Sequence, residues 1–291
     1  MNKEKILKAG EIAKQVKIFA KSIVKKNVPL LEIAEKIENK IIELGGKPAF
    51  PCNLSINEIA AHYTPSHDDT NLAYGLIKVD FGVHVDGWTS DTAFSLDLEN
   101  SEINKKLIET SKEALDAAAK TIKVGVKANE IGKVIQQTIE KKGFMPVINL
   151  SGHQMIQYYL HAGNTIPNID DNRASIIEPG LYAIEPFVTT GSGKVHDGKP
   201  SGIYMLEDSR PPRSPTARKI LNYIAEEYQT LPFCSRWLVK KFGNSALLAL
   251  RELERNQNLH HFAQLVENPG AIIAQSENTF LVEEKVTVTT E

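Results

Sequence analysis

The chain contains little cysteine and no long apolar run, and both absences narrow its possible functions. Its 291 residues include two cysteines, Cys52 and Cys234, which lie far apart. Without a Cys-x-x-Cys pair, the sequence offers neither a zinc ribbon nor a thioredoxin-like redox centre. No apolar run approaches the roughly 18 residues that a transmembrane helix requires. The charged start of the chain also lacks the apolar core of a signal peptide, so we expect a cytoplasmic protein with no membrane partner.

An excess of charge of one sign is also missing. The 34 Lys and Arg residues nearly balance the 36 Asp and Glu residues, which gives a formal net charge of −2. Nothing in this balance favours nucleic acid as a partner. Basic residues do occur between residues 216 and 255, but neighbouring glutamates offset them, and a solvated helix surface is the favoured interpretation. The basic residues available there include Arg218, Lys219, Arg236, Lys240 and Lys241.

Three common catalytic motifs are absent as well. The sequence has no Gly-x-Ser-x-Gly nucleophile elbow, no phosphate loop ending in Gly-Lys-Ser/Thr and no His-Glu-x-x-His zinc motif. At 42% hydrophobic and 24% charged residues, however, the composition is typical of a globular protein with a sizeable core. Any chemistry must therefore come from residues that are scattered along the chain and brought together by folding.

The periodicity of apolar residues predicts a mixed α+β fold. Helical spacing covers residues 3–45, with an interruption at Pro29, and recurs at 102–122 and 128–142. Strand-like segments lie at 76–96, 180–189 and 271–289. Between the last two strand-like segments, helical patterns at 216–228, 233–242 and 245–255 indicate an inserted helical subdomain.

Five potential metal ligands stand out because several lie in apolar sequence, where a carboxylate is costly unless it is paired or bound to a cation. Asp86–Gly87 is a strong two-residue hairpin signal. A turn there places Asp80 opposite Ala93 and makes Asp91 its diagonal neighbour on the same face. On the hairpin alone, a solvent-facing or turn-capping Asp remains an equal alternative. The candidates are Asp80, Asp91, His153, Glu185 and Glu277.

The other candidates carry less information individually. His153 lies in a glycine-containing segment that we expect to be a loop, and Glu185 lies in an apolar strand-like segment where a buried salt bridge is the alternative. Glu277 has a less apolar context, so an exposed strand position is a stronger alternative there. His62 and His161 carry little signal alone.

Seven motifs together carry a family resemblance that covers nearly the whole chain. They resemble those of type II methionine aminopeptidases, and the short N-terminal segment is similar to the archaeal form. The motifs are residues 50–65 (FPCNLSINEIAAHYTP), 79–84 (VDFGVH), 90–93 (SDTA), 150–153 (LSGH), 160–163 (LHAG), 184–187 (IEPF) and 274–277 (AQSE).

The resemblance implies a pita-bread fold with a helical, winged-helix-like insertion. The catalytic domain is then expected at 1–190 and 268–291, and the insertion at 191–267. The implied activity is removal of the N-terminal methionine from nascent proteins when the second residue is small, through a hydroxide that bridges two divalent cations (Co, Mn, Fe or Zn). We further expect a monomer that contacts the ribosome at most transiently.

The resemblance also assigns roles residue by residue. The five candidates above match the metal ligands, with Asp91 and Glu277 as the bridging carboxylates. His62 and His161 match two active-site histidines that bind substrate rather than metal and, with Glu185, are the expected catalytic residues. Phe50, Leu160, Phe187 and Ile203 match the lining of a methionine pocket, and Phe262 matches a further wall more loosely.

The sequence departs from the family pattern near this site, and two other functions compete. Ser276 and Asn278 replace an aromatic residue and a histidine beside the last ligand, and Pro232 replaces a small residue near the pocket. A proline-specific aminopeptidase needs an additional N-terminal domain for which the chain has no room. A non-catalytic pita-bread protein that binds the ribosome or RNA is the second alternative, although such relatives tend to lose metal ligands.

Overall fold

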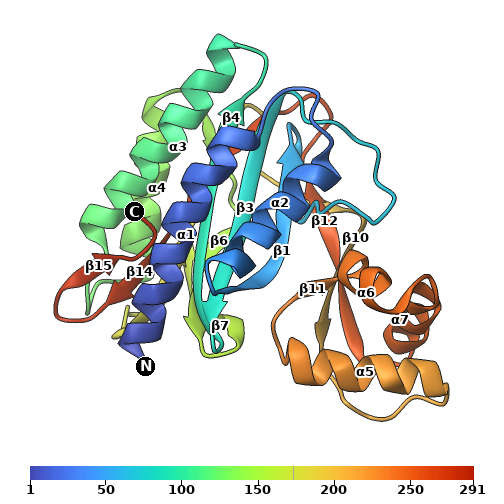
Figure 1. Ribbon diagram of the computed structural model, residues 1–291. Helices are drawn as coiled ribbons and strands as arrows, with labels where there is room; N and C mark the ends of the chain where they lie inside the picture. The colour runs from blue at the N-terminus through green and yellow to red at the C-terminus, as the bar shows by residue number, and fades with distance from the viewer. Residues whose placement is uncertain (173) are drawn as a thin grey trace.

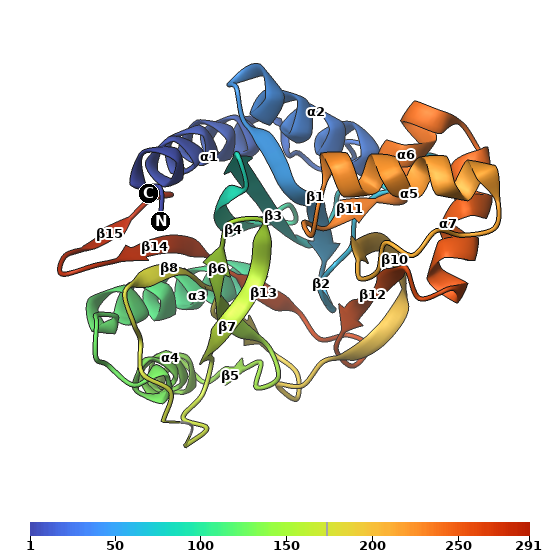
Figure 2. The ribbon, with the colours of Figure 1, turned by 90° about the horizontal axis from the view of Figure 1, so that it is seen from below.

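Two helix-covered sheets face each other across the centre of the molecule, and a third lobe is attached to one side (Figures 1 and 2). The structure is a computed structural model that describes residues 1–172 and 174–291. In Figure 2, helices α1 and α2 cover one outer face and helices α3 and α4 cover the opposite one. The sheets therefore form the inner layers, and their facing sides are the natural place for a site.

The first half contains α1 (Lys3–Ile23) and α2 (Leu30–Glu43), which pack on a sheet of strand order β1-β3-β4. Asn2 caps α1 by accepting a hydrogen bond from the backbone N–H of Lys5, and Pro29 precedes α2, which confirms the predicted interruption. Apolar residues of both helices pack on the sheet and form one buried core. The strands are β1 (Lys47–Ile56), β3 (Leu76–Val85) and β4 (Trp88–Asp97).

The second half repeats this plan with α3 (Glu102–Thr121) and α4 (Ala128–Lys141), close to the predicted ranges. Its larger sheet has the order β15-β14-β8-β6-β7, and a smaller one has the order β13-β9-β5. The strands are β5 (Met145–Pro146), β6 (Ser151–Ile156), β7 (Tyr159–Pro167), β8 (Gly180–Ile184), β9 (Phe187–Thr189), β13 (Ile273–Gln275), β14 (Asn278–Val282) and β15 (Val286–Val288).

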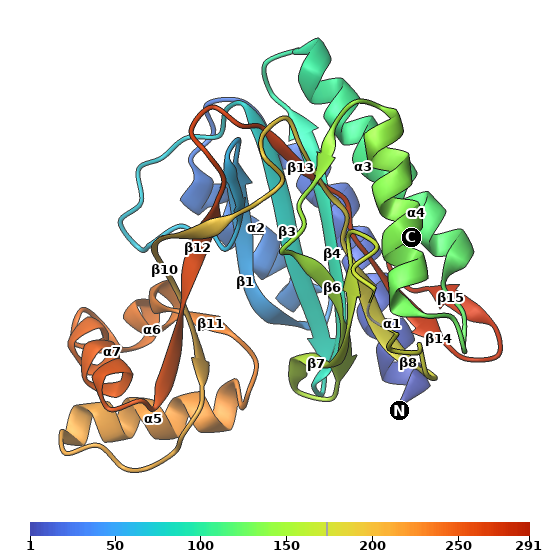
Figure 3. The same cartoon turned by 180° about the vertical axis from the view of Figure 1, so that it is seen from behind.

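The third lobe contains the three predicted helices of the insertion, α5 (Pro215–Glu227), α6 (Ser235–Phe242) and α7 (Ser245–Arg255). They enclose a core of their own, which includes Ile220 and Leu250. The lobe also contains strands that the sequence did not reveal (Figure 3). These are β10 (His196–Leu206), β11 (Phe233–Cys234) and β12 (Leu259–Val266), in a sheet of order β11-β10-β12-β2 that ends at β2 (Ile59–Ala61) of the first half.

This shared sheet changes the expected picture of the insertion from a purely helical one to a mixed lobe. Because β12 pairs with β2, the lobe is continuous with the first half, and the boundaries at 191 and 267 remain a prediction. Within the described ranges, no helix combines the length and apolar character needed to cross a membrane.

Candidate metal centre

The hairpin of β3 and β4 presents Asp80 and Asp91 as predicted. Asp80 pairs with Ala93 and Gly82 pairs with Asp91, which is the register that the two-residue turn requires. Both turn residues have positive φ, 48° at Asp86 and 78° at Gly87, as a tight hairpin of matching twist demands. The two carboxylates are therefore diagonal neighbours on the face of the sheet that points to the second half.

The second half supplies His153 and Glu185. His153 lies within β6, so the expectation that it occupies a loop is wrong; it pairs with Ala183 of β8, and Glu185 follows the end of that strand. Strand pairing thus places both side chains beside the hairpin. His153 Nε2 lies 3.6 Å from Asp91 Oδ2 and 3.8 Å from Glu185 Oε1.

Glu277 completes the cluster from the segment between β13 and β14. It is only 2% exposed, so the alternative of an exposed strand glutamate is wrong. Its backbone forms an isolated antiparallel bridge with Ala93, which joins the two halves at this point. The ligand atoms of Asp91, His153 and Glu277 all lie within 4.8 Å of one another.

The electrostatics of the cluster disfavour four ionised carboxylates without a positive charge nearby. Burial raises the pKa of Asp80 to about 7, and burial together with the neighbouring carboxylates raises the pKa values of Asp91, Glu185 and Glu277 well above their usual range. Among the described residues, the buried atoms Asp80 Oδ1 and Asp91 Oδ1 have no hydrogen-bond partner. Four carboxylates and one imidazole with free lone pairs are a donor set that suits divalent cations.

His153 is in the correct protonation state to act as a ligand. Burial and the neighbouring His161 lower its pKa well below the usual value, so that the imidazole is neutral at physiological pH. A neutral imidazole offers the lone pair that a metal needs. The residues present therefore fit a divalent metal centre.

His62 and His161 lie beside the cluster and not within it. The rings of His153 and His161 are 4.4 Å apart. The surrounding protein lowers the pKa of His161 to about 4 by desolvation, although the residue is exposed and lines the cavity. His62 Nδ1 lies 3.1 Å from the carbonyl oxygen of Ala263 in β12, and burial lowers its pKa as well. With φ of 65°, His62 adopts a left-handed backbone conformation that is uncommon outside glycine and is typical of functional sites.

A cavity of about 220 Å³ opens onto the cluster and contains every pocket residue that the resemblance implied. Aromatic and aliphatic side chains dominate its walls, as expected for a site that accepts an apolar side chain. The first and second halves contribute Phe50, Leu160 and Phe187, and the lobe contributes Ile203, Pro232 and Phe262.

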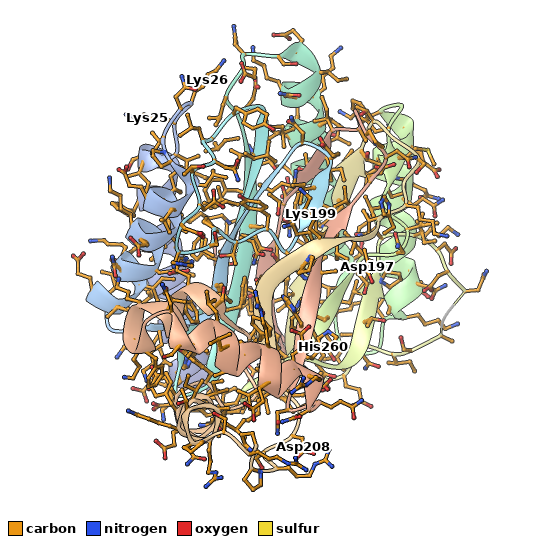
Figure 4. The ribbon with its side chains drawn as sticks, turned by 90° about the vertical axis from the view of Figure 1, so that its right-hand side faces the viewer. Lys25, Lys26, Asp197, Lys199, Asp208 and His260 are labelled. Carbon is orange, nitrogen blue, oxygen red and sulfur yellow. The ribbon has the colours of Figure 1, made fainter. Side chains whose placement is uncertain are left out.

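Strands β10 and β12 contribute Ile203, Phe262 and Leu265 to the lining of this cavity. Figure 4 labels the exposed residues Asp197 and Lys199 on β10 and His260 on β12. The charges of Asp197 and His260 reach His62, where Asp197 raises the pKa of the imidazole and His260 lowers it, both less than burial does. The lobe therefore influences the electrostatic environment of His62 as well as the shape of the cavity.

Sequence reasoning missed Asn53 and Gln275. Asn53 lines the cavity, and its register partner on β3 is Asp80. Gln275 Nε2 lies 3.3 Å from Glu185 Oε2 and 3.5 Å from Glu277 Oε2, so this buried amide donates to two ligand carboxylates at once. Asn53 lies in the motif at 50–65 and Gln275 in the motif at 274–277. An amide side chain within a strand-like segment was the signal that could have identified them as site residues.

The two residues that depart from the family pattern have defined partners. The hydroxyl of Ser276 lies 2.8 Å from that of Ser111 in α3. Asn278 Oδ1 accepts hydrogen bonds from Lys17 Nζ at 3.0 Å and from the hydroxyl of Thr290 at 3.0 Å. Both side chains therefore have hydrogen-bond partners, and both support the segment that carries Glu277.

Comparison with known proteins decides the family. The model of metallopeptidase family M24 matches residues 4–284. The chain belongs to this family. It is 47% identical over 298 residues to a methionine aminopeptidase of Pyrococcus horikoshii, with all of both chains covered.

Two solved structures confirm the fold. A methionine aminopeptidase of Thermotoga maritima has a TM-score of 0.71 at 20% identity and covers 99% of this chain and 96% of its own. A thermophilic Arx1 has a TM-score of 0.85 at 15% identity, with 98% and 90% of the two chains covered. The predicted pita-bread fold and enzyme class are thereby confirmed for this M24 chain, and membership of the family implies divalent metal use.

Proposed function

We propose that the protein releases the N-terminal methionine of polypeptides, with divalent cations held by Asp80, Asp91, His153, Glu185 and Glu277. The observation that carries the proposal is a cluster of four carboxylates, with pKa values raised by burial, beside an apolar cavity of about 220 Å³. The names of the relatives support methionine as the residue released.

When bound, two cations at these ligands would lower the pKa of a shared water and polarise the scissile carbonyl. The ligand set is rich in carboxylates and has one imidazole, so Mn²⁺, Fe²⁺ and Co²⁺ suit it as well as Zn²⁺. Asp91 and Glu277 are the proposed bridging ligands. A threonine near each residue holds the backbone of the other. The Thr279 hydroxyl donates to the Asp91 carbonyl at 2.8 Å, and the Thr92 hydroxyl donates to the Glu277 carbonyl at 2.9 Å.

The remaining polar residues of the cavity act on the substrate. His161 is neutral at physiological pH and would donate a hydrogen bond to the oxygen of the scissile carbonyl as negative charge develops there. His62, which also lines the cavity, would contact the peptide group beyond the scissile bond. Glu185 would transfer a proton to the leaving nitrogen, since its carboxylate lies at the junction of the cluster and the cavity.

The apolar walls favour an unbranched, flexible side chain such as that of methionine. The restriction to a small second residue, the nascent chain as substrate and the cytoplasm as the site of action follow from the family resemblance. A non-catalytic role in binding the ribosome or RNA is less well supported, because all five ligand positions are filled and converge.

A metal-dependent peptide assay tests the proposal. The protein is stripped with a chelator, reloaded with Mn²⁺, Fe²⁺, Co²⁺ or Zn²⁺ separately, and assayed with Met-Ala-x and Ala-Ala-x peptides. We expect methionine release from the first peptide only, and only after reloading. Cleavage of both peptides, or of neither with any of the metals, would contradict the proposed activity.

A further inference from the structure

A buried ion pair joins the lobe to the first half of the molecule. Arg236, in the first turn of α6, donates to Glu38 of α2 through Nη1 at 2.7 Å and Nη2 at 2.8 Å. The two residues are 3% and 6% exposed. This burial corrects the prediction that Arg236 belongs to a solvated basic surface.

The same pair also holds two further segments. Arg236 Nε donates to the carbonyl of Pro65 at 3.0 Å, and Glu38 accepts from the backbone N–H of Cys52 at 3.1 Å. The indole of Trp237 donates to Glu38 at 2.8 Å. One ion pair therefore fixes α6, α2, β1 and the segment after β2 relative to one another.

Three of these four segments, all except α2, have a residue that lines the cavity close by in sequence. Pro232 lies four residues before Arg236, and Phe50 and Asn53 flank Cys52 on β1. His62 lies three residues before Pro65. The lobe wall continues to Ile203, which pairs with Cys234 of β11. The ion pair thus joins the cavity wall that the lobe contributes to the wall that the first half contributes.

An open cleft lies on the other side of the pair. A cleft of about 430 Å³ separates α2 and β1 from α5 and α6, and both Glu38 and Arg236 line it. The ion pairs across this cleft, Lys47–Glu227 and Lys240–Glu35, involve exposed side chains and contribute little. A buried ion pair is itself a poor source of stability, but its two parallel hydrogen bonds are strongly directional.

We propose that Arg236 and Glu38 are a positioning pair that sets the width of the cavity and thereby its selectivity for the side chain of methionine. This inference rests on the proposed function. The pair touches neither substrate nor ligand residues; it acts by holding the Pro232 and Ile203 wall at a fixed distance from the Phe50 wall. Loss of its directional bonds lets the lobe wall move, and a wider cavity binds methionine less tightly while it admits branched side chains.

The variants Glu38→Gln and Arg236→Lys test this with little change in volume. We expect KM for a Met-Ala-x peptide to rise about tenfold and kcat to change less than about threefold, because uniform binding is lost and the reacting groups are untouched. The preference for Met-Ala-x over Leu-Ala-x, measured as a ratio of kcat/KM, should fall about tenfold. Bound metal should be unchanged. The matched control is Glu227→Gln, which breaks an exposed ion pair across the same cleft and should change none of these values.

The possible outcomes distinguish a failure of the positioning role from a failure of the proposed function. Folded single variants with unchanged KM and unchanged Met/Leu preference overturn the positioning role. If the single variants do not fold, the double variant Glu38→Met with Arg236→Met removes both charges and restores an apolar contact. A folded double variant that has lost the Met/Leu preference supports the role, and one that keeps it overturns the role. Failure of the unaltered protein to release methionine under any metal instead contradicts the proposed function.

Discussion

The buried charged residues around Glu38 and those around Asp91 are built in opposite ways. The group around Glu38 is internally complete: one carboxylate meets one guanidinium, and a backbone N–H and an indole N–H satisfy its remaining lone pairs. The group around Asp91 contains four carboxylates, and the buried oxygens Asp80 Oδ1 and Asp91 Oδ1 lack partners among the described residues.

The difference separates a structural site from a ligand site. A buried charge without a partner is costly, so folding tolerates it only where something else compensates. In the first group, the charge of Glu38 is compensated by Arg236 of the same chain, and the pair contributes to the structure by fixing the geometry of the segments it joins. In the second group, burial and mutual repulsion raise the pKa values of the carboxylates. The Gln275 amide and the Lys17 charge offset this only in part, which leaves a role for cations from solution.

The largest effect is expected from Asp91→Asn. Asp91 is a proposed bridging ligand, so its loss should lower kcat/KM about ten-thousandfold, because metal ions contribute several kcal/mol of transition-state stabilisation. The metal-free variant should nevertheless melt at a higher temperature than the metal-free parent, since one of four repelling charges is gone. Metal analysis, peptide cleavage and melting curves with chelator check this. A melting temperature of the metal-free variant below that of the metal-free parent would show that the protein itself compensates the negative charge of the cluster.

The opposite result is expected for Glu38→Leu. This change leaves Arg236 buried without a counter-charge, which typically costs about 3–5 kcal/mol of unfolding free energy. Denaturant unfolding at constant metal concentration measures it. An unfolding free energy within about 1 kcal/mol of the parent would mean that water reaches Arg236 and that the comparison with the metal cluster is wrong.

His161→Ala should reduce turnover without loss of metal. The loss of one donor to the developing negative charge typically costs about a hundredfold to a thousandfold in kcat. Because His161 is not among the proposed ligands, the number of bound cations per chain should stay at the parent value. Steady-state kinetics and metal analysis of the same sample distinguish the two; a drop in bound metal would make His161 a ligand.

Only part of this comparison could be predicted from the sequence. The placement of Asp80 and Asp91 follows from a local rule, since a two-residue turn fixes the register of its hairpin. The helices were also predictable, because their apolar spacing is regular and their ends carry caps or proline. Both kinds of signal depend on neighbours in sequence.

The remaining features depend on contacts between distant segments. Glu277 meets Ala93 across most of the chain, and Arg236 meets Glu38 across 198 positions, so no spacing within one segment reveals either pair. Only the family resemblance predicted that Glu277 joins the cluster, and nothing predicted the partner of Arg236. Strand β10 was missed because Gly198, Pro200 and Gly202 disturb its alternation, and its pairing with β12 is irregular there.

The smallest effect concerns His84, a buried imidazole that lines the cleft between α2 and α5. Among the described residues it has no buried counter-charge of the kind that Glu38 provides for Arg236, and it is not part of the metal cluster. Burial lowers its pKa to about 4, Lys47 acts in the same direction, and Glu227 and Asp86 oppose it. Its folded pKa lies below the unfolded value of about 6.5, so the folded state binds fewer protons between these values. The free energy of unfolding should therefore fall as pH drops from about 6.5 to about 4, by on the order of 2 kcal/mol from this group.

The variant His84→Asn removes this contribution and keeps an acceptor near the backbone N–H of Gly87, which His84 Nδ1 accepts at 3.0 Å. Unfolding free energies of parent and variant, measured from pH 7 to pH 4, should converge or cross as the parent loses stability faster. The carboxylates common to both proteins cancel in this difference. Parallel curves over that range would place the pKa of His84 near its unfolded value, and its side chain would then be compensated in the folded state as Arg236 is.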